Sequence, residues 1–142
     1  MARKQPKRKQ RPGVDEYGRT PLHYAAAEGQ VEEVIRSLSD GANPNAQDAD
    51  GWSPLHFAAQ AVSPGSTEAL LAAGAKMELK DSFGNTALSK AVFSSRGNGS
   101  VIQLLRGSGA DPYAANSSGV TPLSLARTIA NFDVRQFFVD LP

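Results

Sequence analysis

The sequence predicts an all-α repeat solenoid, in which pairs of helices stack side by side along the chain. One observation is a recurring group of four residues, called the tetrad below. It stands at positions 20–23 as Thr-Pro-Leu-His, at 53–56 as Ser-Pro-Leu-His, at 86–89 as Thr-Ala-Leu-Ser and at 121–124 as Thr-Pro-Leu-Ser. A second observation is the regular spacing of glycines, since Gly18, Gly51 and Gly84 are 33 residues apart and Gly119 follows after 35. A fixed period of this length is typical of repeat architectures.

Each of these four-residue groups predicts the start of a helix. The Thr or Ser hydroxyl caps free backbone N–H groups, and Pro at the first helical position lacks a donor that would have no partner there. The Leu then points into a core, and the alanines that follow, such as Ala25 and Ala26, let a second helix approach closely. The Gly-Ala pairs at 41–42, 74–75 and 109–110 predict the end of each second helix, because Gly adopts the left-handed conformation without strain.

Motif, period and terminating Gly-Ala pair agree in register over about residues 15–139. In this pattern the chain resembles the ankyrin repeat family, for which Thr-Pro-Leu-His-x-Ala at a period of 33 is the signature. The resemblance implies helix-turn-helix pairs linked by β-hairpin-like loops. We expect one repeat domain over residues 13–142, with repeats at about 15–47, 48–80, 81–115 and 116–142.

The individual repeats differ in how well they follow the pattern. In repeat 1 the first helix is expected from Pro21 to Glu28. In repeat 2, Ser63 and Pro64 can start the second helix, although Gly65 weakens its first turn by about 1 kcal/mol relative to Ala.

Repeat 3 departs most from the pattern, since Ala87 and Ser89 replace the Pro and the His. Its two extra residues are expected within 96–100, between the two helices. Repeat 4 is expected to end in a helix that contains Val134, Phe137 and Phe138.

Charge divides the chain into a basic tail and an acidic body. Six of the 15 Lys and Arg residues lie in the first eleven positions, whereas from residue 12 on there are 9 basic and 14 acidic residues, a net charge of −5. We expect residues 1–12 to be disordered. They are interpreted either as a solubilising tail or as a nucleic-acid contact or nuclear-import signal around residues 6–9. We expect neither a secretory signal nor a membrane span.

No arrangement of residues in the sequence predicts catalysis. The absence of Cys excludes disulfides, Cys-based zinc sites and thiol catalysis. His23 and His56 are too few ligands for a protein-held zinc ion. The family resemblance implies instead that each bonds to the backbone of the adjoining loop. Asp48 and Asp50 are expected on an exposed loop, as plain surface charge rather than a catalytic pair. We therefore expect no enzyme, no cofactor and no metal.

What remains is a binding surface. The resemblance implies that loop tips and the exposed face of each first helix hold a partner. Carried onto this sequence, these positions are Glu16, Tyr17, Arg19, Glu28, Asp50, Trp52, Gln60, Ser82, Phe83, Asn85, Phe93 and Val120. Because Tyr17, Trp52 and Phe83 each adjoin a loop glycine, we expect an exposed aromatic row of the kind that forms interface hot spots. The alternative is that Phe83 or Phe93 packs on its own loop or helix.

The leading hypothesis is a non-enzymatic protein-protein interaction module for one specific, basic partner, since the acidic body attracts positive charge. By analogy, such a small array could be an inhibitor, or an immunity protein that blocks a cognate toxin. The alternative is a nucleic-acid-associated or nuclear adaptor that uses residues 1–12. We expect a monomer when free, located in the cytoplasm or, in a eukaryote, the nucleus.

Overall fold

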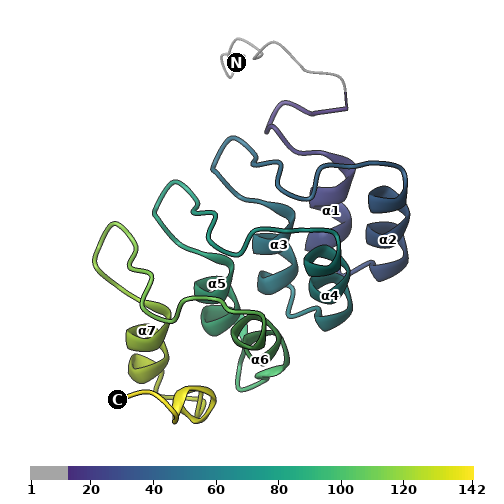
Figure 1. Ribbon diagram of the computed structural model, residues 1–142. Coiled ribbons are helices and arrows are strands. Elements are labelled where there is room, and N and C mark those ends of the chain that lie inside the picture. The colour runs from purple at the N-terminus through teal and green to yellow at the C-terminus, as the bar shows by residue number, and fades with distance from the viewer. Residues whose placement is uncertain (1–12) are drawn as a thin grey trace.

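Helices of the chain pack as a single row of pairs, with the connecting loops projecting from one side (Figure 1). The computed structural model describes residues 13–142, so the tail at 1–12 lies outside the described residues and its disorder stays a prediction. Within 13–142 the helices are α1 (Pro21–Ala27), α2 (Val31–Ser39), α3 (Pro54–Gln60), α4 (Pro64–Ala72), α5 (Ala87–Ser94), α6 (Ser100–Gly107), α7 (Pro122–Thr128) and the 3-10 helix η1 (Arg135–Phe138). The predicted all-α solenoid is confirmed.

Two layers of helices make up the array. The first helices α1, α3, α5 and α7 contact one another in order, and the second helices α2, α4 and α6 form the layer behind them. The four tetrad leucines are buried, with exposed fractions of 0 to 4%: Leu22, Leu55, Leu88 and Leu123. The alanines that follow them are buried as well, as the close approach of the two layers requires.

Every first helix begins where the tetrad predicts it. Thr20, Ser53, Thr86 and Thr121 are the N-caps, and each hydroxyl accepts a hydrogen bond from the backbone N–H three residues later. In α1, α3 and α7 the residue that donates this N–H also accepts the N-cap N–H with its side chain, which completes a capping box.

The hairpin-like loops before the first helices share one hydrogen-bond pattern. In each loop the first residue accepts two backbone N–H groups, two and four positions later, with one side-chain oxygen: Asp15, Asp48, Asp81 and Asn116. Neighbouring loops are joined by a backbone bond, for example from Ala49 N–H to the Tyr17 carbonyl at 2.8 Å.

Three of the regularly spaced loop glycines, Gly18, Gly51 and Gly84, make this close stacking of loops possible. Gly51 has a φ of +79°, and a Cβ on it would lie 2.9 Å from the Cα of Asp81 in the next loop. Gly119 shares the positive φ but has no neighbour within 4 Å, since no loop stacks on it among the described residues.

The second helix of repeat 2 begins at Pro64, with Ser63 as its N-cap, as predicted. The structure explains why a glycine stands at position 65, which the sequence alone does not. A Cβ at this position would lie 2.9 Å from Cγ2 of Val31, so the missing side chain lets α2 approach α4.

The insertion in repeat 3 lies between its two helices, as expected. Residues 95–99 connect α5 to α6, whereas the corresponding connections in repeats 1 and 2 are residues 28–30 and 61–63. Arg96 and Gly97 both have positive φ, which turns the longer connection back toward α6.

Repeat 4 ends in a helix, as expected, but this is the short 3-10 helix η1 and not an α-helix. Phe137 and Phe138 lie within it, whereas Val134 is its N-cap residue. Val134 and Phe138 are nevertheless buried, at 0 and 2% exposure, so the spacing correctly marked apolar anchors. Arg106 holds this turn in place, since its guanidinium donates to the Phe137 carbonyl and to the Asp140 carboxylate, both at 2.7 Å.

Candidate functional site

The candidate surface is the side of the array formed by loop tips and first helices (Figure 1). Nine of the twelve expected contact residues are exposed there: Glu16, Tyr17, Glu28, Asp50, Gln60, Ser82, Phe83, Phe93 and Val120. The remaining three, Arg19, Trp52 and Asn85, are half-buried. The role of these residues in binding stays a prediction.

Phe83 and Phe93 are among the most exposed large apolar side chains of residues 13–142, at 70 and 76%. With so little of either ring covered, packing on their own loop or helix does not account for them. Tyr17 is also exposed, at 54%. Large aromatic side chains that are exposed on one side of a protein are typical of surfaces that bind another protein.

Trp52 does not stand in the exposed row that the sequence predicted. Its ring centroid lies 4.8 Å from that of Phe57, and the Lys90 ammonium lies 3.9 Å from it. Phe57 belongs to α3 of the same repeat, whereas Lys90 comes from α5 of the next. Because half of this environment comes from a different repeat, the residues around Trp52 in sequence give no signal of it.

Asp48 is buried rather than exposed, which corrects the expectation of plain surface charge. One of its side-chain oxygens accepts the N–H groups of Asp50 and Trp52, and the other lies 3.1 Å from Nε of Arg19. The Arg19 guanidinium in turn faces the Tyr17 ring, at 5.2 Å from its centroid. This ion pair joins the loops of repeats 1 and 2, so Asp48 is structural.

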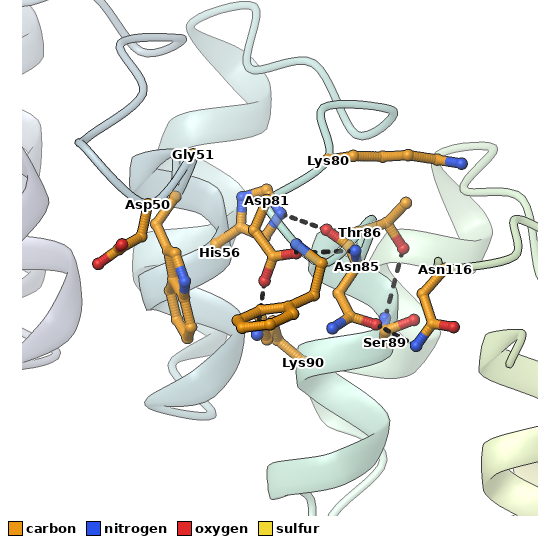
Figure 2. A network of polar contacts seen from close by, with 12 residues as sticks. Asp50, Gly51, His56, Lys80, Asp81, Asn85, Thr86, Ser89, Lys90 and Asn116 are labelled. Carbon is orange, nitrogen blue, oxygen red and sulfur yellow. Dashed lines mark hydrogen bonds and ion pairs between the residues drawn. The ribbon is translucent and has the colours of Figure 1, made fainter. Parts of the chain in front are cut away.

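Asp81 is the equivalent loop residue one repeat further on, but its ion-pair partner Lys90 comes from α5 of the same repeat (Figure 2). Its side chain is fully buried, and the Lys90 ammonium lies 2.9 Å from Oδ2. Burial opposes ionisation, but the bonds from Lys90 and from the N–H of Asn85 outweigh it and hold the pKa of Asp81 below its ordinary 3.8. A carboxylate that stays charged in this way cannot serve as a proton donor near neutral pH.

The two histidines tie neighbouring repeats together. In His23, Nδ1 accepts the N–H of Thr20, so Nε2 carries the proton and donates to the Trp52 carbonyl at 3.0 Å. His56 makes the same bridge to the Asn85 carbonyl at 2.9 Å, as Figure 2 shows. Burial lowers the pKa of both imidazoles, and their carbonyl bonds only partly oppose it. Both ring nitrogens are therefore used in the fold.

The described residues of this surface do not gather into a metal site. Across residues 13–142, no three His, Cys, Asp or Glu side chains gather as metal ligands would. The arrangement on the loop side offers contact area and charge, which are the means by which a surface binds a partner.

A groove of about 360 Å³ opens between α5 and α7, where the tetrad is weakest. It is lined by Asn85, Ser89, Lys90, Phe93, Asn116, Val120 and Leu125. Sequence reasoning found Asn85, Phe93 and Val120 but not Ser89 or Leu125. The only signal of the groove in the sequence is Ser89, which stands where repeats 1 and 2 have His.

Comparison with known proteins agrees with this geometry. A profile of three ankyrin repeats matches residues 32–116, and a profile of a single ankyrin repeat matches residues 17–46. The chain belongs to the ankyrin repeat family. An ankyrin array of this kind is a protein-protein interaction module.

Similar proteins contain this array as one part of a longer chain. The human transient receptor potential cation channel subfamily A member 1 is 35% identical over 114 residues, which is 80% of this chain but 10% of the channel. Human Rabankyrin-5 is 56% identical over 41 residues, or 29% of this chain and 4% of that protein. Ankyrin repeat domain-containing protein 37 of Xenopus tropicalis is 36% identical over 73 residues, covering 51% of this chain and 45% of that protein.

This chain thus spans less than half of each of these relatives. Among its described helices, none has the length and apolar character needed to cross a membrane.

Proposed function

We propose that this ankyrin array is a non-catalytic module that holds one specific basic protein through its loop tips and first helices. The observation that carries the proposal is the combination of exposed rings and unpaired carboxylates on one side. Phe83 and Phe93 are exposed there, as are Glu16 and Asp50. Within residues 13–142, neither of these two carboxylates has an ion-pair partner.

The distribution of charge supports a basic partner. Repeats 1 and 2, residues 13–80, contain 10 acidic and 4 basic residues, a net charge of −6. Repeats 3 and 4, residues 81–142, contain 4 acidic and 5 basic residues, a net charge of +1. A field of one sign speeds association with an oppositely charged protein and disfavours wrong partners. The first two repeats are therefore expected to attract the partner.

The test is to capture partners from the source cell with the full chain and with two double variants. Phe83→Ser with Phe93→Ser removes the rings, and Glu16→Lys with Asp50→Lys reverses the charge. Both are expected to weaken recovery of the same partner at least tenfold. The matched control is Ile35→Ser with Glu32→Lys, which makes the same kinds of change on exposed positions of α2 in the other layer. A partner retained equally by all three variants contradicts the proposal.

Inhibition of a toxin is a special case of this function, favoured by the net charge of −5 after residue 11. In that case the array covers the active surface of a basic protein such as a nuclease toxin. Addition of an equimolar amount of the chain should then abolish the activity of the purified partner. Full activity in the complex rules out inhibition but leaves binding in place.

The alternative function uses the basic tail. Six Lys and Arg residues within the first eleven positions favour contact with nucleic acid or with an import receptor. Deletion of residues 1–12 separates the two functions. If the physiological target is lost with the tail and is indifferent to Phe83 and Phe93, the tail and not the array is the binding element.

The free array is proposed to be a monomer. Light scattering of the purified chain tests this directly, because a dimer would double the measured mass.

A further inference from the structure

The groove between α5 and α7 lies at the junction of repeats 3 and 4, and this junction lacks the histidine side chain that bridges the other two. At the corresponding junctions of repeats 1–2 and 2–3, an imidazole spans from one first helix to the carbonyl of the next loop. The residue at this position in repeat 3 is Ser89, which is too short to reach the carbonyl of Val120. That carbonyl accepts only the N–H of its own loop residue Asn116, at 2.9 Å, among the bonds of residues 13–142.

A second substitution widens the same junction. The last loop position before each N-cap is Arg19 in repeat 1 and Trp52 in repeat 2, and both side chains pack against Phe57. In repeats 3 and 4 this position holds the smaller Asn85 and Val120. Space that an imidazole and a large side chain occupy elsewhere is therefore open between α5 and α7.

The lining of the groove indicates what it can receive. Phe93, Val120 and Leu125 provide apolar walls. The longer polar side chains are already engaged, since Nδ2 of Asn116 donates to Oδ1 of Asn85 at 3.0 Å and Lys90 is paired with Asp81 (Figure 2). No carboxylate lines the groove, and so it suits an apolar group rather than a cation.

We propose that this groove receives one bulky apolar side chain of the partner, from a segment whose Lys and Arg residues contact the acidic loop tips of repeats 1 and 2. This inference rests on the proposed function and adds to it the order and spacing of the basic and apolar residues in the partner segment. The net charge of −6 on repeats 1 and 2 selects a basic segment, and the groove lies beyond that field, where the net charge is +1.

The spacing within the segment follows from helix packing. Packed helices lie about 8–10 Å apart, so the groove is roughly 15–25 Å from the loop tips that carry Glu16 and Asp50. An extended chain covers about 3.3–3.6 Å per residue. The basic residues should therefore stand about four to eight positions from the apolar residue.

The experiment is selection of a displayed random-peptide library on the full chain and on its Ser89→His variant. The new imidazole should fill the groove and bond to the Val120 carbonyl, as His56 does with Asn85. The wild-type chain is expected to enrich peptides with Lys or Arg at one end and an aromatic residue or Leu about four to eight residues away. The Ser89→His chain should bind those peptides at least tenfold more weakly.

Ser89→Ala is the matched control, since it leaves the groove open and should keep wild-type affinity. Ser89→His should also raise the melting temperature, which separates a filled groove from a damaged fold. Enriched peptides without an apolar residue, no enrichment at all, or equal affinity for Ser89→His would each overturn the inference.

Failure of the proposed function gives a different result. If the groove alone is wrong, the captured partner ignores Ser89→His but is still lost with Glu16→Lys and Asp50→Lys. If the binding surface itself is wrong, the partner is indifferent to both changes.

Discussion

His56 is a single residue on which two repeats depend, because its ring bonds to its own N-cap and to the carbonyl of Asn85. Its replacement by Ala leaves a cavity and takes away the acceptor of the buried Ser53 N–H, while the Asn85 carbonyl keeps only its bond from the Asp81 N–H. The free energy of unfolding should fall by about 2–4 kcal/mol. Urea unfolding at pH 7.5 measures this. Lys76→Ala, which removes an exposed side chain in the same repeat, should change it by less than about 0.5 kcal/mol.

The same imidazoles predict a pH dependence. Burial lowers the pKa of His23 and His56 from 6.5, so the unfolded chain binds more protons than the folded chain just below pH 6.5. The stability they contribute is complete above that pH and declines as the pH falls toward the lowered values. The carboxylates Asp81 and Asp140, whose pKa is below 3.8, change the stability only in a more acidic range.

We therefore expect the free energy of unfolding to decrease between pH 7 and 5, and to decrease less in His56→Ala than in the wild type. Chemical denaturation at several pH values tests this. Parallel curves for the two proteins would mean that His56 is not the titrating group.

Asp81 and Asn116 occupy equivalent loop positions, which makes a natural comparison. Both bind two loop N–H groups with one side-chain oxygen, but only Asp81 also faces a lysine. Asp81→Ala should cost about 2–4 kcal/mol of stability, because it orphans two buried donors and a partly buried ammonium. Asp81→Asn keeps the loop acceptor and should cost clearly less. Thermal unfolding of the two variants decides between a loop role and an ion-pair role.

Single residues also show where sequence reasoning ends. The N-caps were predictable because a hydroxyl, a proline and a helix start lie within four positions. The partial burial of Trp52 was not, since it depends on Lys90 from the next repeat. The burial of Asp48 was not predictable for the same reason, because Arg19 of the preceding loop covers it.

At the scale of helices, two glycines without positive φ should respond to alanine in opposite ways. Gly107, at the end of α6, has open space, and Gly107→Ala should stabilise by about 0.5–1 kcal/mol through helix propensity. Gly65→Ala gains the same propensity in α4, but its Cβ would lie 2.9 Å from Val31, so we expect a net loss of about 1 kcal/mol. Val31→Ala should rescue Gly65→Ala in a double-mutant cycle, and an additive cycle would contradict the contact.

The sequence pattern predicts a helix at the end of repeat 4 but does not determine which type of helix forms there. The spacing of Val134, Phe137 and Phe138 fits an α-helix and a 3-10 turn equally well, because both bring residues three or four apart onto one face. Burial of these anchors does not require a full helix, and bonds from Arg106 to the Phe137 carbonyl and Asp140 hold the short turn in place. The candidate surface was predicted from repeat register, whereas the groove at Ser89 required the neighbouring repeat.

At the scale of the whole molecule, stability should be unequal along the row. In a repeat array each unit is stabilised by its neighbours, so a weak junction divides the chain into parts that open separately. The junction of repeats 3 and 4 lacks the imidazole bridge, opens as a groove and is followed by η1 instead of an α-helix. We therefore expect repeat 4 to be the least stable repeat of the array.

We expect amide hydrogen exchange of α7 to be faster than that of α3 by at least tenfold, because α3 has a histidine bridge on both sides. Ser89→His should slow exchange in α7 and leave α1 nearly unchanged, since the added bond acts at the last junction alone. Mass spectrometry of peptic fragments from the two proteins gives both rates in one experiment. Uniform exchange across α3 and α7 would mean that the array opens as one cooperative unit despite the missing bridge.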